Sequence, residues 1–219
     1  MLIQNWMTRN PATVTPETSM LKASKLMKER HIRRLPVVNE HGQLVGIVSD
    51  RDLKEASPSK ATSLDMHEMY YLLSELKVKD VMTRNPITVR EDDLIDLAAL
   101  LMEEKKVGGF PVLDAEGRLT GVITGSDVFK CLTRFTGARM GGLLLAFERP
   151  DQPGELRPIL DMLYEHGASI ISVLTTHETV NGLRRLYIRV RPMKPESERH
   201  LVNELTEAAR LVFWRNAPE

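Results

Sequence analysis

The pattern of apolar and polar positions occurs twice along the chain, with an offset of 75 residues. Residues 6–53 align without a gap on residues 81–128. The matching pieces are Trp6–Pro11 with Val81–Pro86, Leu35–Val37 with Phe110–Val112, and Gly46–Asp52 with Gly121–Asp127. Two copies are fewer than a solenoid requires. The duplication therefore predicts two similar units related by a pseudo-twofold axis, with a shared cleft built from equivalent parts.

Each copy has the pattern of a short strand, a helix, a two-stranded hairpin and a second helix. In the second copy, apolar residues follow the i, i+3, i+4, i+7 spacing of a helix with one buried stripe. These residues are Leu94, Ile95, Leu97, Ala98, Leu101 and Met102, matched in the first copy by Met20, Ala23, Leu26 and Met27. Two short apolar runs then flank a turn that contains glycine, which predicts a hairpin. The runs are Leu35–Val38 and Leu44–Val48 in the first copy, and Phe110–Leu113 and Leu119–Ile123 in the second.

A different pattern separates the copies. Residues 57–63 are rich in Ser and predict a loop, and Asp65–Leu76 carries apolar residues on one helical side, which predicts a helix packed on the module. We assign the first repeat to residues 1–60, the connecting loop and helix to residues 61–80, and the second repeat to residues 81–136.

The last part of the chain, residues 142–215, alternates strands and helices in the order βαββαβ. A strand over Leu143–Glu148 is followed by a turn and by a helical stripe that ends at Gly167. Asn181-Gly182 lies between two further strands and is a strong hairpin dipeptide. The remaining elements are strands over Ile170–Thr176 and Leu186–Val190, a helix over Glu196–Arg210 and a strand over Leu211–Trp214. The fold class predicted for the whole chain is α/β (α+β).

Composition limits the kinds of function. Lys plus Arg number 30 and Asp plus Glu number 30, so no overall field attracts nucleic acid or an anionic membrane. The single cysteine excludes an intrachain disulfide, and the histidines show no metal-ligand spacing. No segment has the roughly 20 apolar residues that span a bilayer, and the amino terminus lacks the features of a signal peptide. We expect a soluble cytoplasmic protein without a metal site.

Ser49 and Thr124 occupy equivalent positions, each directly after a predicted strand and before a predicted helix. A hydroxyl and backbone N–H groups at a helix start are a natural seat for a phosphate. Three residues later, Asp52 and Asp127 can accept two hydrogen bonds from ribose hydroxyls. The same spacing also fits a capping box, in which both side chains only satisfy the helix's own N–H groups. On the residues alone the two interpretations have equal weight.

The repeated motifs resemble those of tandem CBS domains, the pair known as a Bateman module. The order MTRNPATV, LPVV and GIVSDRD recurs in the second copy as MTRNPITV, FPVL and GVITGSD. The resemblance covers about residues 6–135. In this family two repeats pack side by side through their sheets and leave two clefts that bind adenine nucleotides or related adenosyl ligands. The resemblance therefore implies a sensor and not a catalyst.

The resemblance also implies roles for individual residues. It implies ribose contacts by Asp52 and Asp127, phosphate contacts by Ser49, Thr124, Arg33 and Arg34, and adenine-side strands at Thr13, Thr88, Pro36 and Pro111. The regulatory ligand implied is AMP, ADP or ATP, with S-adenosylmethionine as the alternative. No catalytic cofactor is implied.

The two copies differ ahead of the proline that both share. Arg33 and Arg34 in the first copy correspond to Gly108 and Gly109 in the second. Planar guanidinium groups favour bidentate contact with phosphate, whereas glycine offers only its backbone. We therefore expect two clefts that are not equivalent. The alternative for the two arginines is a solvated surface pair.

Residues 142–215 resemble an ACT domain, a ferredoxin-like module that binds amino acids or associates subunits. The resemblance rests on the βαββαβ order and on the Asp151–Gly154 turn. It implies a ligand turn in which Gly154 lets a ligand approach the backbone and Asp151 faces the ligand's ammonium group. Ser169 stands where several amino-acid-binding relatives carry asparagine. Two alternatives stay open, namely that the glycine only shapes the turn and that the domain only mediates association.

Two CBS repeats followed by one ACT domain resemble the acetoin-utilisation B-type proteins. No nucleophile–base pair, phosphate-binding loop or metal motif appears in the sequence. Our leading hypothesis is a non-catalytic homodimeric regulator that senses adenine nucleotide, and an amino acid at the ACT domain, and signals to a separate protein. The first alternative is a structural dimerisation module with no bound nucleotide, and the second is an S-adenosylmethionine sensor. An enzyme acting on nucleotides is least favoured, because Asp52 and Asp127 have no adjacent base.

Overall fold

The computed structural model describes residues 1–56 and 74–217. They belong to two compact units, Met1–Val128 and Phe129–Glu219. This division lies within helix α6 (Gly125–Phe135), ahead of the boundary predicted at residues 136–142. The helix predicted over Asp65–Leu76 falls largely on residues 57–73 and so lies outside the described residues.

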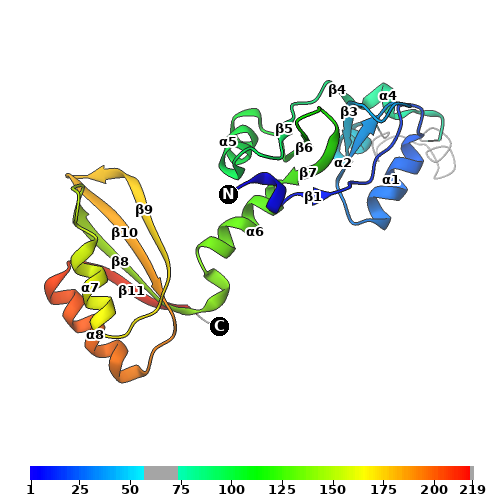
Figure 1. Cartoon of the computed structure of the whole chain (residues 1–219). Coiled ribbons are helices and arrows are strands. Elements are labelled where there is room, and N and C mark those ends of the chain that lie inside the picture. The colour runs from blue at the N-terminus through cyan, green and yellow to red at the C-terminus, as the bar shows by residue number, and fades with distance from the viewer. Residues whose placement is uncertain (57–73, 218–219) are drawn as a thin grey trace. The chain divides into compact units, whose positions relative to one another are not determined.

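In the first unit the two repeats contain equivalent elements in the same order (Figure 1). The first repeat has η1 (Ile3–Asn5), β1 (Thr8–Arg9), α1 (Met20–Glu29), β2 (Arg34–Val38), β3 (Leu44–Ser49) and α2 (Asp50–Ala56). The second has α4 (Val78–Val81), β4 (Thr83–Arg84), β5 (Val89–Arg90), α5 (Ile95–Lys105), β6 (Gly109–Leu113), β7 (Leu119–Thr124) and α6. The predicted order of strand, helix, hairpin and helix is therefore confirmed, with an additional short strand, β5, before the helix of the second repeat.

The two repeats exchange their first strands. β1 of the first repeat pairs antiparallel with β7 of the second, with Thr8 opposite Val122. β4 of the second repeat pairs in the same way with β3 of the first, with Thr83 opposite Ile47. The resulting sheets have the orders β1-β7-β6-β5 and β2-β3-β4. Each repeat thus receives an edge strand from the other.

Backbone contacts outside the strands follow the same symmetry. The Met20 N–H donates to the Leu76 carbonyl at 2.8 Å, and the Ile95 N–H donates to the Met1 carbonyl at 2.9 Å. The two donors are 75 residues apart in sequence, and so are the two acceptors. Each hydrogen bond is therefore the copy of the other with the repeats exchanged, which confirms the predicted pseudo-twofold relation.

A glycine in each of the strands β3 and β7 allows the exchanged segment to cross closely. A Cβ atom on Gly46 would lie 2.5 Å from the Sδ atom of Met82 and 3.1 Å from the carbonyl oxygen of Thr83. Gly121 faces Met7 in the same way. A side chain at either position would displace the methionine and press on the crossing backbone, so glycine at both positions favours the strand exchange.

The helices of the two repeats differ in how much of their apolar side they bury. In α1, Met20, Ala23 and Met27 are buried, as predicted. In α5, Ile95 and Ala98 are buried, but Leu94 and Leu97 are 49% and 40% exposed. The prediction of one buried stripe is therefore wrong for these two leucines. Helical spacing identifies the apolar side of a helix but does not show how much of that side its own chain covers.

The second unit is a four-stranded antiparallel sheet with the strand order β11-β8-β10-β9. Its elements are η2 (Ala138–Met140), β8 (Gly142–Pro150), α7 (Arg157–Glu165), β9 (Ile170–Val180), β10 (Leu183–Val190), α8 (Pro195–Ala208) and β11 (Leu211–Ala217). Both helices cover one face of the sheet (Figure 1) and enclose a core that includes Leu145, Phe147, Ile159, Leu163, Ile188, Leu201 and Leu205. The predicted βαββαβ order is confirmed.

Local signals set the ends of the second unit's elements. Asn181 and Gly182 form the turn between β9 and β10 with φ values of 53° and 74°, and two such residues match a type I′ turn. The predicted hairpin is therefore confirmed, with β9 continuing beyond Thr176 up to the turn. On the sheet face opposite the helices, Arg189 is 9% exposed and donates hydrogen bonds to the Thr136 and Gly141 carbonyls.

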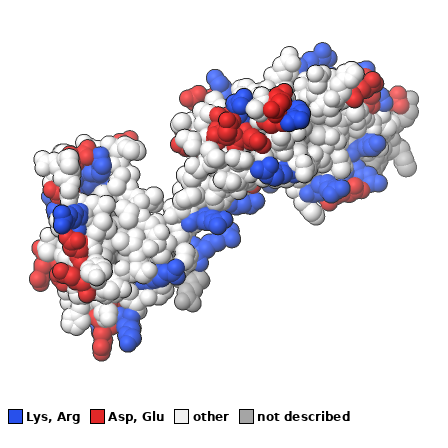
Figure 2. Space-filling model, in the orientation of Figure 1, with Lys and Arg blue, Asp and Glu red and all other residues white. Residues whose placement is uncertain are grey.

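Side chains of both charge signs appear on the visible face of each unit (Figure 2). Over residues 1–56 and 74–217, no helix combines the length and the apolar character that crossing a membrane demands.

Candidate functional site

Both predicted helix starts have the hydrogen bonds of a capping box. The backbone N–H and the hydroxyl of Ser49 donate to Oδ2 of Asp52 at 2.6 and 2.8 Å. Thr124 makes the same two hydrogen bonds to Oδ2 of Asp127, at 3.0 and 2.6 Å. The carboxylate half of a capping box is therefore present in both repeats, and in the first repeat the Asp52 N–H also donates to Oγ of Ser49, at 3.5 Å. Because a carboxylate has two oxygens, a cap made through Oδ2 is compatible with a ligand contact through Oδ1.

The backbone holds each helix start against the segment that precedes the central hairpin. The Asp50 N–H donates to the Arg33 carbonyl at 2.9 Å, and the Gly125 N–H donates to the Gly108 carbonyl at 3.2 Å. The arginine pair and its glycine counterpart therefore lie beside the helix start of their own repeat.

The side chain of Arg34 crosses from the first repeat to the second. Its backbone lies in β2 opposite Ser49. Its guanidinium group lies against Gly108 and Gly109, since a Cβ atom on Gly108 would be 2.8 Å from Nη2 and one on Gly109 would overlap Nη1. The predicted inequality of the two repeats thus takes a specific form. One arginine occupies the space that two glycines leave.

Two carboxylates act on this guanidinium group, one from each repeat. Burial has the largest influence on the pKa of Arg34 and lowers it from its usual value, and the neighbouring Arg33 lowers it further. Asp50, at the start of α2, and Asp127, near the start of α6, raise the pKa. Because arginine stays protonated at neutral pH, the result is a half-buried cation between the two helix starts.

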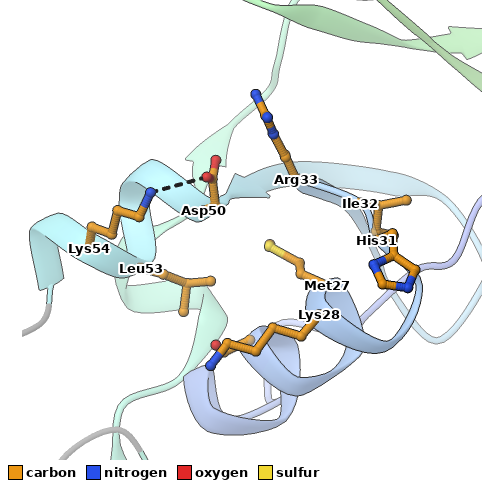
Figure 3. Close-up of a pocket in the computed structure, with 9 residues that line it drawn as sticks. Met27, Lys28, His31, Ile32, Arg33, Asp50, Leu53 and Lys54 are labelled. Carbon is orange, nitrogen blue, oxygen red and sulfur yellow. Dashed lines mark hydrogen bonds and ion pairs between the residues drawn. The ribbon is translucent and has the colours of Figure 1, made fainter.

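Arg33 lies elsewhere, at the edge of a pocket of about 620 Å³ on the first repeat, with its side chain directed away from Met27 and Leu53 (Figure 3). The pocket is lined by Ser24, Met27, Lys28, His31, Ile32, Arg33, Asp50, Leu53 and Lys54. Of the residues predicted to contact nucleotide, all of which the structure describes, Arg33 alone is in this set. The structure therefore separates the two arginines that the sequence presents as a pair.

The four residues predicted for the adenine side lie beside the central hairpins. Val14 forms a parallel bridge with Val37, and Val89 pairs in parallel with Val112. This pairing puts each predicted threonine beside the predicted proline of its own repeat. The pairs are Thr13 with Pro36 and Thr88 with Pro111. Both prolines are buried, Thr88 is half-buried and Thr13 is exposed.

In the second unit, the predicted ligand turn between β8 and α7 already has internal partners. Oδ1 of Asp151 lies 2.6 Å from Nη2 of Arg184. Gly154 has a φ of 92° and open space around it, and a positive φ by itself favours glycine. A ligand's ammonium group would have to share Asp151 with Arg184 or displace it.

Ser169 lies at the other end of the same sheet. The residue after it, Ile170, begins β9 and is level with Leu143 at the start of β8. The turn that contains Gly154 follows Pro150, at the end of β8. Leu143 and Pro150 are seven residues apart, roughly 24 Å along an extended strand. Within one chain Ser169 therefore does not meet the turn, and a joint site requires a second copy.

Asp50 and the lysines of the pocket are not among the residues predicted from the sequence. Asp50 acts on Arg34 and also forms an ion pair with Lys54 at 3.4 Å. A signal was available in the duplication. Asp50 corresponds to Gly125 and Lys54 to Phe129, so the charge changes at both positions, as it does at the arginine pair.

Comparisons with known proteins match the two repeats of the first unit. Residues 3–59 and 78–134 match the family model described as the CBS domain. A CBS domain-containing protein from Dictyostelium discoideum is 36% identical over 133 residues, which are 61% of this chain and 92% of that protein. The L-aspartate semialdehyde sulfurtransferase of Methanocaldococcus jannaschii is 31% identical over 58% of this chain, but the match spans only 22% of that enzyme.

Three solved structures show the same similarity. AcuB of Vibrio cholerae, designated for acetoin utilization, gives a TM-score of 0.52 at 29% identity and covers 64% of this chain and 95% of its own. CBSX2, a protein of Arabidopsis thaliana, gives 0.51 at 33% identity in its complex with AMP and covers 62% and 98%. The CBS domain pair of protein MJ0100, with 5′-methylthioadenosine and S-adenosyl-L-methionine, gives 0.50 at 30% identity and covers 60% and 95%.

Proposed function

The chain belongs to the CBS domain family, and on that basis we propose that its paired repeats are a regulatory sensor of adenosine-based ligands that signals to a separate protein. The observation that carries the proposal is the Arg34 guanidinium group, held between the helix starts that contain Asp52 and Asp127. A ribose requires an acceptor such as a carboxylate, and a phosphate requires a cation. This part of the first unit supplies both.

Each residue has a proposed role. The Asp52 and Asp127 carboxylates accept hydrogen bonds from ribose hydroxyls through the oxygen that does not cap the helix. The hydroxyls of Ser49 and Thr124 can rotate from the cap toward a phosphate, which Arg34 neutralises. The two threonine–proline pairs beside the central hairpins face the adenine.

Two of the similar structures support an adenosyl ligand. The structure of CBSX2 contains AMP, and that of the MJ0100 pair contains 5′-methylthioadenosine and S-adenosyl-L-methionine. These molecules share an adenosyl group and differ in charge at the 5′ position. A cation at that position favours a phosphate over a sulfonium group. We therefore place AMP, ADP and ATP ahead of S-adenosylmethionine for this chain.

A binding panel with a matched pair of variants tests the proposal. A nucleotide present at 100 times its Kd stabilises the native state by about 2.7 kcal/mol, which raises the Tm of a chain of this size by several degrees. Arg34→Gln should weaken the binding of AMP at least tenfold and the binding of adenosine less than threefold. Arg30→Gln, at the exposed end of α1, should change neither. No melting shift and no calorimetric heat with any adenosyl compound would overturn the proposal.

A second candidate function, association of the chain with itself, is favoured by exposed leucines on α5. Leu94, Leu97 and Leu100 are 49%, 40% and 56% exposed. Several large apolar side chains exposed together mark an interaction surface more often than a solvated one. We propose a homodimer, in which the repeats act as a sensor or, in the alternative, only as a structural module. Light scattering at low micromolar concentration should give the dimer mass, and a clean monomer mass would refute it.

For the second unit we propose the role of an ACT domain. The βαββαβ order and the strand order β11-β8-β10-β9 support this assignment. Its ligand would be an amino acid at the Asp151–Gly154 turn, with Ser169 contributed by a second copy, and the alternative is association without a ligand. Titrating the twenty common amino acids against the full chain tests this. If none of the twenty amino acids binds, the role that remains for this unit is association.

A further inference from the structure

The pocket between α1 and α2 of the first repeat combines apolar and basic side chains (Figure 3). Met27 and Leu53 are 4% and 9% exposed and form its apolar wall. Lys28, Arg33 and Lys54 are exposed along its edge. A volume of about 620 Å³ lies within the range of sites that hold small organic molecules.

The edge of this pocket retains positive charge after its internal pairing. Among the described residues that line it, three are cations, Lys28, Arg33 and Lys54, and one is a carboxylate, Asp50, which pairs with Lys54 at 3.4 Å. Three cations against one carboxylate leave a net charge of plus two. A low-dielectric wall beside uncompensated cations favours an anion in the space between them. The apolar wall favours a ligand that also carries an apolar body.

The fold does not require this chemistry, because the second repeat has the same backbone plan without it. The basic positions Lys28, Arg33 and Lys54 correspond to Glu103, Gly108 and Phe129 in the second repeat. The apolar wall is partly kept, since Met27 corresponds to Met102. The basic edge is therefore a property of one repeat and calls for an explanation other than packing.

We propose that this pocket binds a small amphipathic anion, an organic molecule with a carboxylate or phosphate on an apolar body. The anionic group lies between Lys28 and Lys54, and the apolar body lies on Met27 and Leu53. The site is distinct from that of the adenosyl ligand, because Arg34, Asp52 and Asp127 do not line it, although Asp50 borders both.

Methionine methyl signals of the full chain, labelled with carbon-13 and observed by NMR, test this proposal. The probes are 2-naphthoate and 2-naphthyl phosphate, with neutral 2-naphthalenemethanol as the uncharged control. The Met27 signal, assigned with Met27→Leu, should shift saturably with one or both anions and at least tenfold more weakly with the alcohol. Met102, at the equivalent position of the second repeat, is the internal control and should not respond.

Matched lysine variants locate the anion. Lys28→Gln and Lys54→Gln should each weaken binding of the anionic probe about fivefold, the usual scale of a partly exposed charge contact. Lys25→Gln, on the same helix but outside the pocket lining, should leave it unchanged. Three results would overturn the proposal: no saturable Met27 shift, an equal response of Met102, or displacement of the probe by AMP. Each is independent of whether AMP raises the Tm, so failure here is distinguishable from failure of the nucleotide sensor.

Discussion

The two repeats of the first unit share a backbone plan and differ in the charges placed around it. Gly46 and Gly121 meet the exchanged segments in the same way, and both helix starts carry the same capping hydrogen bonds. By contrast, Arg33, Arg34, Asp50 and Lys54 correspond to Gly108, Gly109, Gly125 and Phe129. Close packing thus accounts for the positions that stayed alike. These four diverged positions lie at the Arg34 guanidinium group, at the pocket between α1 and α2, or at their counterparts in the second repeat.

The divergence at the arginine pair is itself a packing solution. Arg34 lies on the two glycines of the other repeat, so a side chain at those positions would compete with it for the same space. The first repeat supplies the cation, and the two glycines of the second repeat leave the space that it occupies. The two repeats are therefore complementary in shape at this position.

The largest change in the free energy of unfolding is expected at Gly46 and Gly121, which meet the exchanged segments in the same way in both repeats. Gly46→Ala and Gly121→Ala should each lower the free energy of unfolding by about 2–3 kcal/mol, because the added methyl group overlaps the crossing segment. Urea denaturation measures this. Gly117→Ala is the control: its φ is 79° but the space is open, so it should cost only about 1 kcal/mol. A difference above about 1 kcal/mol between the two main variants would contradict the symmetric packing.

Substitutions at Gly108 and Gly109 should have smaller effects on the free energy of unfolding, and the two effects should differ. Gly109→Ala meets the Ile123 carbonyl oxygen at 2.5 Å as well as Arg34, and should cost about 2 kcal/mol. Gly108→Ala meets only the end of the Arg34 side chain, and should cost less than 1 kcal/mol. In an Arg34→Gln background the cost at residue 108 should vanish and the cost at residue 109 should persist. A double-mutant cycle of unfolding free energies measures both, and equal behaviour would place Arg34 elsewhere.

Substitutions of the two helix-start aspartates separate a role in ligand binding from a role in helix capping. Asp52→Asn and Asp127→Asn should change the free energy of unfolding by less than 1 kcal/mol, because asparagine remains a good helix cap. Each substitution should still weaken the binding of adenosine and of AMP to the same extent, by about tenfold, since both ligands carry the ribose. Calorimetric titration measures the affinities. If the affinity falls only in proportion to the fraction of unfolded protein, both carboxylates serve only to cap their helices.

The smallest expected effect is at Arg33. Arg33→Gln should change the free energy of unfolding by less than 0.5 kcal/mol, as at other exposed positions, and weaken AMP no more than about threefold. Arg34→Gln serves as its counterpart, with at least a tenfold loss. Equal losses for the two variants in the same titration would show that both arginines reach the phosphate.

Elements specified by neighbouring residues were predictable from the sequence. Asn181-Gly182 marked its hairpin, and the spacing in α1 marked its buried side, because both signals lie within a few residues. The strand exchange was not predictable. β1 and β4 contain two exposed residues each, so no apolar pattern identifies their partners. The exposure of Leu94 likewise depends on what covers it and not on its spacing.

The candidate site was predictable as a set of residues but not as an arrangement. The Ser-x-x-Asp and Thr-x-x-Asp motifs marked both helix starts, where each aspartate accepts the backbone N–H expected in a capping box. The direction of Arg34 depends on the small size of Gly108 and Gly109, 74 and 75 residues later in the chain. The separation of Ser169 from Gly154 depends on the sheet register, which the order of elements alone does not specify.

The exchange of first strands also sets an order in which the chain can be completed during synthesis. Thr83 of β4 finds its partner Ile47 only 36 residues earlier, whereas Thr8 of β1 pairs with Val122, 114 residues later. Because synthesis runs from the amino terminus and distant contacts close slowly, the sheet of the first repeat closes while the second is still being made. β1 is made before the other strands of the first unit, but it cannot enter its sheet until β7 has been made. A nascent chain that stops before β7 therefore leaves β1 without its partner strand.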